Sequence, residues 1–444
     1  MLFQRFLDDR SGSVMPLLAL AAIPVVGLIG ASIDYSRAAA IQTTMQAAAD
    51  STSLAMYKEA AKLNATQLQT EAQAYFNAMF VNTGAAPPTV NVSYTNTAGS
   101  QVVITANSSV NTLFMGLMGF SQLPISATST AVWGNTRLRV ALVLDNTGSM
   151  SQGGSGTASS PNKIQALQTA SHSLLQQLQT AATNEGDVYV SIVPFAKDVN
   201  VGKTNYSQPW VDFTDWDAAN GTCSKSRQST QASCTANGGK WKSADHSTWN
   251  GCVTDRDQNY DTTNATPTSG GTLFPAEQYD ACPTAIVPLT YDWTALGAAI
   301  DAMTPNGGTN QAIGAAWGWQ SLTQTSPLSA PSEDPNYRYQ HIVIILSDGL
   351  NTQDRWYGNG STPSSQVDGR QRIACDNMKN AGVTIYAVQV NTDNEATSSV
   401  LQYCAGSKAG AADPTKFFLL TAPKQIVTTF NQIGTQLSKL RISN

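Results

Sequence analysis

Three oxygen-bearing side chains alternate along a short stretch of this chain and could together bind a metal ion. Asp145, Thr147 and Ser149 are each separated by one residue, so an extended turn can direct a carboxylate and two hydroxyls towards one point. Gly148 allows the backbone to turn tightly between them. Oxygen atoms of this kind are the ligands that hard cations such as Mg2+ and Ca2+ prefer. The pattern therefore predicts a divalent-cation site.

Two further oxygen ligands come from later parts of the chain. Thr309 follows the Gly307-Gly308 turn, and Asp348 follows an apolar run at 341–346, just as Asp145 follows one at 138–144. Such runs are typical of strands that are buried on both faces of a parallel sheet. Ligands of parallel sheets bind beyond the carboxyl ends of the strands. We therefore expect one site for Mg2+, or alternatively Mn2+ or Ca2+, formed by Asp145, Thr147, Ser149, Thr309 and Asp348.

The segments between these motifs supply the other elements of an α/β sheet. Lys163–Ala182 has apolar residues at helical spacing, and it is followed by a buried strand at Val188–Ala196. A helix between two buried strands is the usual right-handed parallel connection. The remaining expected elements are helices at Tyr291–Met303, Gln311–Leu322, Arg370–Ala381, Ser398–Ala405 and Pro423–Leu440, and strands at Val383–Val390 and Lys416–Leu420.

From about Arg137 to the C-terminus, these motifs in this order resemble the von Willebrand factor A (vWA) domain. The resemblance implies an α/β fold over residues 137–444, with a Rossmann-like parallel sheet flanked by helices. It also implies a metal-ion-dependent adhesion site (MIDAS), where a carboxylate of a partner protein completes the coordination of the ion. Some vWA domains keep the fold and have lost the metal, and this alternative stays open.

The resemblance also suggests how the five side chains share the ion. Thr147, Ser149 and Thr309 would lie directly on it, and Asp145 and Asp348 would act through water. The family more often has serine where this chain has Thr147, but the hydroxyl is kept. In a metal-free domain, Asp145 or Ser149 would instead cap a helix.

An uncharged apolar segment near the N-terminus predicts a membrane anchor. Val14–Ile33 is twenty residues long, which is enough to span a bilayer as a helix. Arg5 and Arg10 precede it, so the positive-inside rule puts the N-terminus in the cytoplasm and the rest of the chain outside. A signal peptide cleaved near Ala38–Ala40 is the alternative. The helical pattern that continues to Lys62 favours an uncleaved anchor.

The residues around this segment resemble the N-terminal segment of Tad (Flp) pilus-assembly proteins of the TadE/TadG type. The shared features are Gly12-Ser13 before the apolar run, Asp34-Tyr35 at its outer end, and Gln46–Ser51. Combined with a downstream vWA domain, they resemble the TadG-like group. The resemblance implies an anchor and pilin-like helix over residues 1–62. It also implies a single-pass protein of the inner membrane, with its bulk in the periplasm or at the cell surface.

Residues 63–133 predict a small membrane-proximal α+β unit of pilin-like type. Three stretches alternate polar and apolar residues as half-buried strands do, and Asn96–Gly99 would form a hairpin turn. The stretch Val110–Phe120 predicts a short apolar helix. The expected strands are Thr89–Tyr94, Gln101–Thr105 and Ile125–Val132.

Residues 198–287 form an insertion in the vWA-like pattern. They include few aliphatic side chains and no clear periodicity, so we expect them to bury little core and to be held by disulfides. The chain has six cysteines, no C-x-x-C pair and only three histidines, which favours disulfides over a zinc site. Proximity suggests Cys223–Cys234 and Cys252–Cys282, although four cysteines allow three pairings. Cys375 and Cys404 fall on neighbouring helical segments and would form another bond.

Two features of the insertion have alternative interpretations. Asp255–Asp261 begins like a calcium loop, but it lacks the glycine at the sixth position and the glutamate at the twelfth. We interpret it as a solvated turn. Four tryptophans could be partner contacts or the insertion's own small core, and base rates favour the core. They are Trp210, Trp216, Trp241 and Trp249.

The composition, and motifs that the sequence lacks, argue against several classes of function. A net charge of −5 over 444 residues gives no electrostatic footprint for nucleic acid. The sequence contains no H-E-x-x-H, P-loop or G-x-S-x-G motif, so we expect neither an enzyme nor a small-molecule substrate. The prediction is a Tad/Flp pilus-assembly or adhesion protein whose metal site binds an acidic side chain of a pilus or secretion component. The alternatives are a metal-dependent hydrolase and a metal-free structural pseudopilin-like component.

Overall fold

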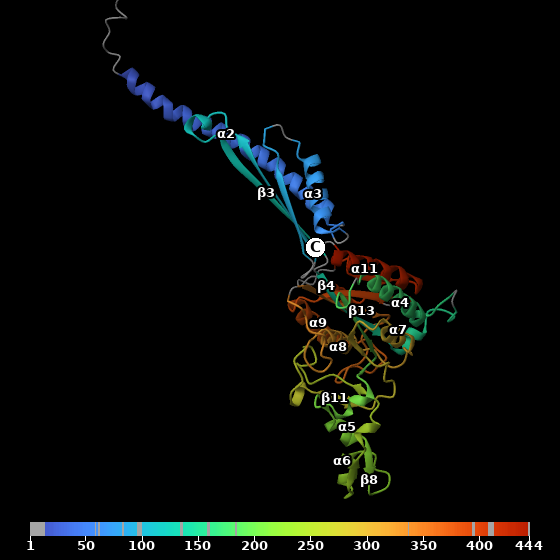
Figure 1. The fold of residues 1–444 in the computed structure, drawn as a ribbon. Helices are drawn as coiled ribbons and strands as arrows, with labels where there is room; N and C mark the ends of the chain where they lie inside the picture. The colour runs from blue at the N-terminus through green and yellow to red at the C-terminus, as the bar shows by residue number, and fades with distance from the viewer. Residues whose placement is uncertain are drawn as a thin grey trace, which may run out of the picture. The chain divides into compact units, whose positions relative to one another are not determined.

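The computed structural model describes residues 14–57, 59–60, 63–81, 84–95, 100–133, 136–157, 160–182, 184–335, 337–392, 396–406 and 413–442. The chain divides into two compact units, Met1–Asn135 and Thr136–Ser443. They are called the N-terminal and C-terminal units below, and each is described by itself (Figure 1).

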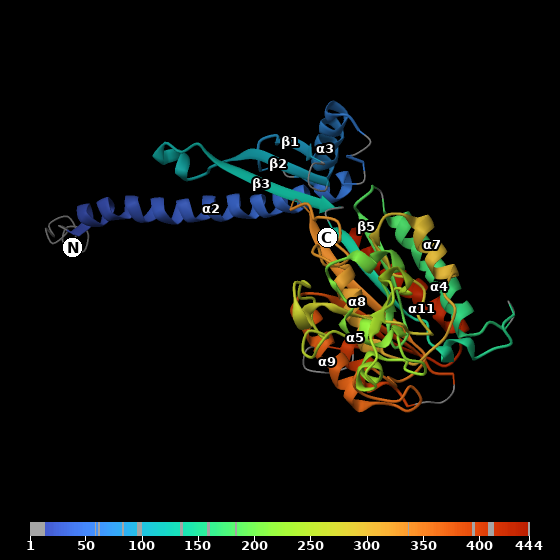
Figure 2. The same cartoon turned by 90° about the horizontal axis from the view of Figure 1, so that it is seen from below.

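The N-terminal unit is a long helix with a small antiparallel sheet packed on its second half (Figure 2). Helix α2 (Val14–Met56) has 43 residues, or about 65 Å at 1.5 Å per residue. Within the described residues, one helical segment, Leu20–Met56, is long and apolar enough to cross a membrane. The expected continuation of the helix to Lys62 is wrong, because α2 ends at Met56. The other elements are α3 (Ala65–Met79), β1 (Thr89–Thr95), β2 (Ser100–Asn111), η1 (Met115–Met118) and β3 (Gln122–Trp133).

Glutamines cover both open edges of this sheet, whose strand order is β1-β2-β3. From α2, Gln42 and Gln46 donate to the carbonyls of Ser126 and Thr128 in β3, at 3.0 and 2.9 Å. From α3, Gln69 donates to the Val90 carbonyl and accepts from the Val92 N–H in β1. Unpaired backbone groups on an edge strand would otherwise invite pairing with another chain. The helices thus fix the position of the sheet as well as burying its face.

The connection between β2 and β3 differs from the sequence-based expectation. Val110–Phe120 was predicted to form a helix, but Val110 and Asn111 complete strand β2. Only Met115–Met118 form a single 3-10 turn. Apolar residues that gather at a hairpin tip resemble a short helix in sequence, because neither has a clear period over so few residues. The expected turn at Asn96–Gly99 lies outside the described residues.

The C-terminal unit confirms the predicted parallel α/β sheet. Five strands run parallel in the order β15-β14-β13-β4-β5. Alternate residues of the central strand face opposite sides: Leu142 and Leu144 pack in one apolar cluster, and Ala141 and Val143 in the other. The strands are β4 (Thr136–Asp145), β5 (Val188–Phe195), β13 (Arg338–Ser347), β14 (Thr384–Val390) and β15 (Phe417–Leu420).

Helices cover both faces of this sheet. Helices α4, α7 and α11 lie together on one side, as Figure 2 shows, and α8, α9 and α10 pack on the other. Helix α8 lies unusually close to the strands. A Cβ on Gly314 would be 2.7 Å from Phe195 Cδ1, and one on Gly318 would be 2.5 Å from Val143 Cγ2. The helices are α4 (Lys163–Ala181), α7 (Trp293–Asp301), α8 (Gln311–Ser321), α9 (Ser365–Asn380), α10 (Ser399–Ala405) and α11 (Lys424–Ile442).

The insertion between β5 and α7 extends the sheet with short strands. Strand β6 continues antiparallel from β5, β10 and β11 follow it, and β12 pairs antiparallel with β5. The elements are β6 (Val199–Asn200), η3 (Lys203–Ser207), β7 (Val211–Asp212), α5 (Thr214–Ala219), β8 (Gly221–Cys223), α6 (Gln231–Ala236), β9 (Trp241–Ser243), η4 (His246–Thr248), β10 (Cys252–Val253), η5 (Gly270–Thr272), β11 (Phe274–Glu277) and β12 (Val287–Thr290); a further 3-10 turn, η2 (Gly148–Ser151), follows β4.

Disulfides hold the C-terminal unit with the expected pairing. Cys223 bonds Cys234, Cys252 bonds Cys282, and Cys375 bonds Cys404, with Cα–Cα distances of 5.7, 5.8 and 5.2 Å. The last of these joins α9 to α10. Each of the three bonds is therefore confirmed in the structure.

The prediction that the insertion buries little core is wrong. Trp210, Trp216 and Trp249 are buried, and they share one apolar cluster with Trp317 of α8. The Phe274 and Trp317 rings lie 4.4 Å apart. Aromatic rings bury large areas each, so a few of them replace many aliphatic side chains. This supports the core interpretation over partner contacts for these three tryptophans, whereas Trp241 is only partly buried and lies outside the cluster.

The interpretation of Asp255–Asp261 as a solvated turn is confirmed only for residues 257–260, which form an exposed turn. Asp255, Arg256 and Asp261 are all buried. Asp261 forms a two-pronged ion pair with Arg370 of α9. Arg256 donates to the backbone carbonyls of Thr263 and Ala265. Because these charged side chains have ion-pair or hydrogen-bond partners, they can be buried where the insertion packs against the rest of the C-terminal unit.

Candidate metal centre

The loop after β4 holds Asp145 in one fixed orientation. Its side chain is fully buried at the carboxyl end of the strand. Oδ1 accepts hydrogen bonds from the backbone N–H and the hydroxyl of Thr147, at 2.9 and 2.6 Å. Oδ2 accepts from the Ser347 hydroxyl at 2.6 Å. Because both oxygens are held, the carboxylate cannot rotate away from the loop.

Four of the five predicted ligands meet in a continuous chain of contacts. The Thr147 and Ser149 hydroxyls lie 3.1 Å apart, and Ser149 Oγ donates to Asp348 Oδ1 at 2.7 Å. Strands β4 and β13 are parallel neighbours with Leu144 opposite Leu346. Their carboxyl ends therefore bring Asp145 and Asp348 to the same place. We call Asp145, Thr147, Ser149 and Asp348 the oxygen cluster.

Thr309 belongs to a loop that is hydrogen-bonded to the Asp145 loop. Gly148 N–H donates to the Gly307 carbonyl at 3.0 Å, and Asn306 N–H donates to the Asn146 carbonyl at 2.9 Å. Thr309 itself is buried, and its N–H donates to Thr352 Oγ1 at 2.9 Å. Among the described residues, no hydrogen bond joins its hydroxyl to the oxygen cluster. The structure thus places Thr309 beside the cluster without a direct bond to it.

The insertion supports the Thr309 loop from both sides. Gly308 N–H donates to the Tyr279 hydroxyl at 3.3 Å. On the other side, Asn310 Nδ2 donates to Asp255 Oδ2 at 2.9 Å. Gly307 has a φ of +84°, and a Cβ there would lie 2.5 Å from the Tyr279 hydroxyl. Only glycine fits this turn, and the insertion helps to fix its position.

The cluster concentrates negative charge in a buried place. Burial, and then the nearby Asp348 carboxylate, raise the pKa of Asp145 to about 7. Lys163, at the start of α4, lies with Nζ 2.8 Å from Asp348 Oδ2, and both side chains are 1% exposed. Two carboxylates and one ammonium give the site a net charge of −1 when both acids are ionised. A bound divalent cation would change this net charge to +1.

The donor set fits a hard cation. The described residues contain no group of three or more His, Cys, Asp and Glu side chains arranged to hold a metal, so hydroxyls have to supply ligands here. Two carboxylates and neighbouring hydroxyls, all oxygen, suit Mg2+, Mn2+ or Ca2+ better than a thiolate- or imidazole-seeking metal. The hydroxyls bring no negative charge, which leaves part of the charge of an ion uncompensated.

Sequence reasoning missed two residues of the site. Ser347 anchors Asp145, and its position just before Asp348 could have suggested that role. Lys163 was assigned only to an amphipathic helix. A lysine in the first turn of a helix is unfavourable towards the helix dipole, and that unusual position was the available signal.

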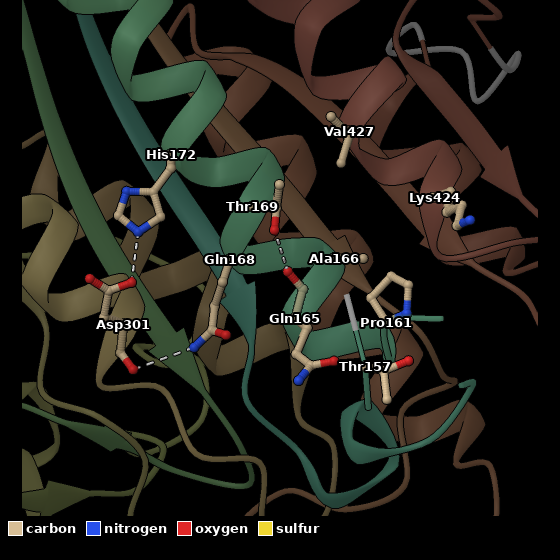
Figure 3. Close-up of a pocket in the computed structure, with 10 residues that line it drawn as sticks. All are labelled: Thr157, Pro161, Gln165, Ala166, Gln168, Thr169, His172, Asp301, Lys424 and Val427. Atoms are coloured by element: carbon tan, nitrogen blue, oxygen red, sulfur yellow. Dashed lines mark hydrogen bonds and ion pairs between the residues drawn. The ribbon is translucent and has the colours of Figure 1, made fainter. Parts of the chain in front are cut away.

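The histidines do not form a catalytic arrangement with a nucleophile. His172 lies in α4 beside a hollow of about 590 Å³, lined by α4, α7 and α11, and its Nε2 is 2.7 Å from Asp301 Oδ1 (Figure 3). His246 and His341 likewise pair with the carboxylates of Asp217 and Glu333. Each imidazole is thus within hydrogen-bond distance of a carboxylate.

Comparison with known proteins connects the N-terminal segment to pilus assembly. Residues 12–59 match the Tad family, described as "Putative Flp pilus-assembly TadE/G-like". No curated protein sequence matches this chain.

Distant likenesses to solved structures cover most of the chain. The pilus adhesin SpaC from Lactobacillus rhamnosus GG, in its open conformation, is 13% identical with a TM-score of 0.36, over 80% of this chain and 34% of SpaC. The PilB minor pilin from Streptococcus sanguinis is 12% identical with a TM-score of 0.38, over 79% of this chain and 78% of PilB. The vWF domain of the type V pili tip protein Mfa5 from Porphyromonas gingivalis is 12% identical with a TM-score of 0.36, over 69% of this chain and 97% of that domain. This chain therefore spans about a third of the length of SpaC.

Proposed function

We propose that this chain is a membrane-anchored Tad/Flp pilus-assembly or adhesion protein of the TadG-like type, whose C-terminal vWA domain binds a partner protein through a MIDAS-type divalent ion. The family match at residues 12–59 supports the pilus-assembly part. The oxygen cluster at the ends of β4 and β13 supports the metal part. It is the observation that carries the proposal, because it brings together acids and hydroxyls that lie about 200 residues apart in sequence.

The side chains of the site suggest how binding would work. Thr147, Ser149 and Thr309 would hold Mg2+ directly, and Asp145 and Asp348 would hold it through water. The bound ion supplies a positive charge with one coordination position open to a carboxylate of the partner. Lys163 neutralises Asp348, so the protein's own side chains contribute a net charge of only −1. The loaded site would therefore be positive and would attract an acidic side chain, without a catalytic step.

The N-terminal helix supports a location at the inner membrane. Its uncharged part, Val14–Ile33, would cross the inner membrane once, with the N-terminus in the cytoplasm. The rest of the N-terminal unit and the C-terminal unit would then lie in the periplasm or at the cell surface, where disulfides form. The partner would be a protein, such as a pilus or secretion component, and neither a nucleic acid nor a small-molecule substrate is expected.

Calorimetric titration of Mg2+ and Mn2+ into the full chain in detergent micelles tests the metal site. We expect binding by the wild type that weakens at least tenfold in Asp348→Ala. Asp301→Ala, which removes an aspartate whose side chain is 68% exposed, is the matched control and should bind as the wild type does. An aspartate-containing peptide should bind only with the metal present, and its asparagine counterpart should not. Equal titrations for all three proteins, or no metal binding even with the acidic peptide, would refute the metal-bridged mechanism.

A further inference from the structure

The hairpin tip between β2 and β3 is apolar and exposed. Residues 112–121 contain no charged side chain. Leu113, Met118 and Phe120 are 62, 50 and 59% exposed. Large apolar side chains that gather on a surface without charges mark a site that contacts another apolar phase.

This tip lies against the uncharged part of α2. A Cβ on Gly30 would be only 2.4 Å from Phe114 Cβ, and one on Gly27 would be 3.2 Å from Met118 Sδ. The two glycines thus form a notch that receives the tip. They precede Asp34, the first charged residue after the apolar run, by four and seven residues. At 1.5 Å per residue the contacts lie about 6 and 10 Å further along the helix, within the apolar run.

Many backbone groups of the tip are hydrogen-bonded within the N-terminal unit. The Asp34 carboxylate accepts from the N–H groups of Leu113, Phe114 and Met115, each at 2.8 Å. Phe120 N–H donates to the Met115 carbonyl at 3.0 Å, and the Thr112 hydroxyl donates to the Phe120 carbonyl at 2.6 Å. An unsatisfied backbone group would cost several kcal/mol in hydrocarbon. These bonds therefore lower the free-energy cost of placing the tip in lipid.

We propose that the hairpin tip 112–121 enters the lipid of the outer leaflet beside α2, as a second membrane contact of the N-terminal unit. This rests on the proposed membrane anchor. The apolar surface of the tip continues that of α2, on which Leu20 and Leu28 are 73 and 72% exposed. A depth of 6 to 10 Å matches that of elements lying in the interface between headgroups and acyl chains, about 5 to 10 Å. Two contacts, unlike a lone helix, fix the rotation and tilt of the sheet relative to the membrane.

Fluorescence quenching in liposomes tests this insertion. The six cysteines are paired in disulfides, so an added cysteine can be labelled alone with the environment-sensitive dye NBD. We would label Met118→Cys at the tip, Val26→Cys in the expected span, and Asn107→Cys, an exposed position on β2 away from the tip. The full chain is reconstituted with phosphatidylcholine brominated on its acyl chains. Quenching at Met118→Cys should reach at least half that at Val26→Cys, and about threefold that at Asn107→Cys.

The three positions separate the possible outcomes. Quenching at Val26→Cys but not at Met118→Cys overturns the insertion and leaves the anchor standing, since the tip would then face water or protein. No quenching at Val26→Cys overturns the anchor as well. As a second test, Gly30→Val should displace Phe114 and reduce quenching at Met118→Cys severalfold. Leu28→Val, at an exposed helix position, is its control and should leave the quenching unchanged.

Discussion

The buried ion pair between Lys163 and Asp348 predicts that a bound divalent cation can replace the Lys163 ammonium as the counter-charge of Asp348. Lys163→Met keeps a side chain of similar length and removes the ammonium. Asp348 would then remain 3% exposed with its Oδ1 still bonded to Ser149, but without its counter-charge at 2.8 Å. Asp145, whose pKa is already raised to about 7 by burial and by Asp348, lies in the same cluster.

The magnitude follows from the burial of the pair. Removing one partner of a buried ion pair costs about 3 to 5 kcal/mol of unfolding free energy, because the other charge stays buried and uncompensated. A divalent cation bound beside Asp348 would replace the missing charge. At a concentration 100 times its Kd it would restore about 2.7 kcal/mol. We therefore expect Lys163→Met to be less stable in EDTA, to bind Mg2+ more tightly than the wild type, and to regain most of the loss in Mg2+.

Urea unfolding of the full chain in detergent, with EDTA or Mg2+, measures this effect. All tryptophans except Trp133 lie in the C-terminal unit, so tryptophan fluorescence reports its unfolding. Lys424→Met removes an exposed lysine at the start of α11 and should change the stability by less than about 0.5 kcal/mol. On an Asp348→Asn background, Lys163→Met should cost less than it does alone, because residues in contact are not additive.

Two results would refute this reasoning. A Lys163→Met protein within about 1 kcal/mol of the wild type in EDTA would show that Asp348 does not depend on the ammonium. Weaker Mg2+ binding in Lys163→Met, with the fold intact, would show that the lysine helps to form the site instead of competing with the ion.

Three further predictions concern the insertion and the core. Replacing Cys252 and Cys282 by alanine should lower the free energy of unfolding by about 2 to 4 kcal/mol. It should also weaken Mg2+ binding severalfold by calorimetry, because this disulfide joins the segments that carry Asp255 and Tyr279. As a control, the same change at Cys223 and Cys234 should lower stability without changing the metal affinity. Burial, and then Asp354, raise the pKa of Asp255 to about 7 from 3.8, so the folded state binds more protons than the unfolded state between about pH 4 and 7. The stability of the wild type in EDTA should fall as pH rises through this window and level off above it, and Asp255→Asn should remove up to about 4 kcal/mol of that fall; parallel urea midpoints for both proteins would contradict this. Gly318→Val should destabilise the C-terminal unit by at least about 1 to 3 kcal/mol in urea, since its side chain would collide with Val143, whereas the same change at the open position Gly369 should cost less.

The central sheet and the meeting of the site residues could be predicted because both depend on one physical pattern. An apolar run that ends in an acid specifies a buried parallel strand and a carboxylate at its end. Two such runs placed side by side bring Asp145 and Asp348 together without further information. The disulfides were also accessible, since near neighbours in sequence close short loops. Whether the cluster binds a metal stays a prediction.

The features that sequence reasoning missed depend on long-range packing. Lys163 meets Asp348 across 185 residues, and nothing in its local pattern specifies that partner. The buried state of Asp255 and Asp261 depends on Asn310, Arg355 and Arg370, which come from other elements. Likewise, the hairpin tip looked like a helix because the pairing of Val110 and Asn111 with β3 is set by the strand register. Such contacts cannot be read from periodicity alone.

The structure also changes how the insertion relates to binding. Had its tryptophans been exposed, they would have been candidates for partner contact. Trp210, Trp216 and Trp249 are instead buried in one cluster with Trp317, which belongs to the helix that follows Thr309. Tyr279 and Asp255, also in the insertion, bond the two residues on either side of Thr309. A loop with two glycines has much conformational entropy to lose on binding a ligand, and these contacts remove part of it before any ligand arrives. The insertion therefore helps to hold Thr309 in place beside the oxygen cluster, and the proposed metal face is where we expect partner recognition.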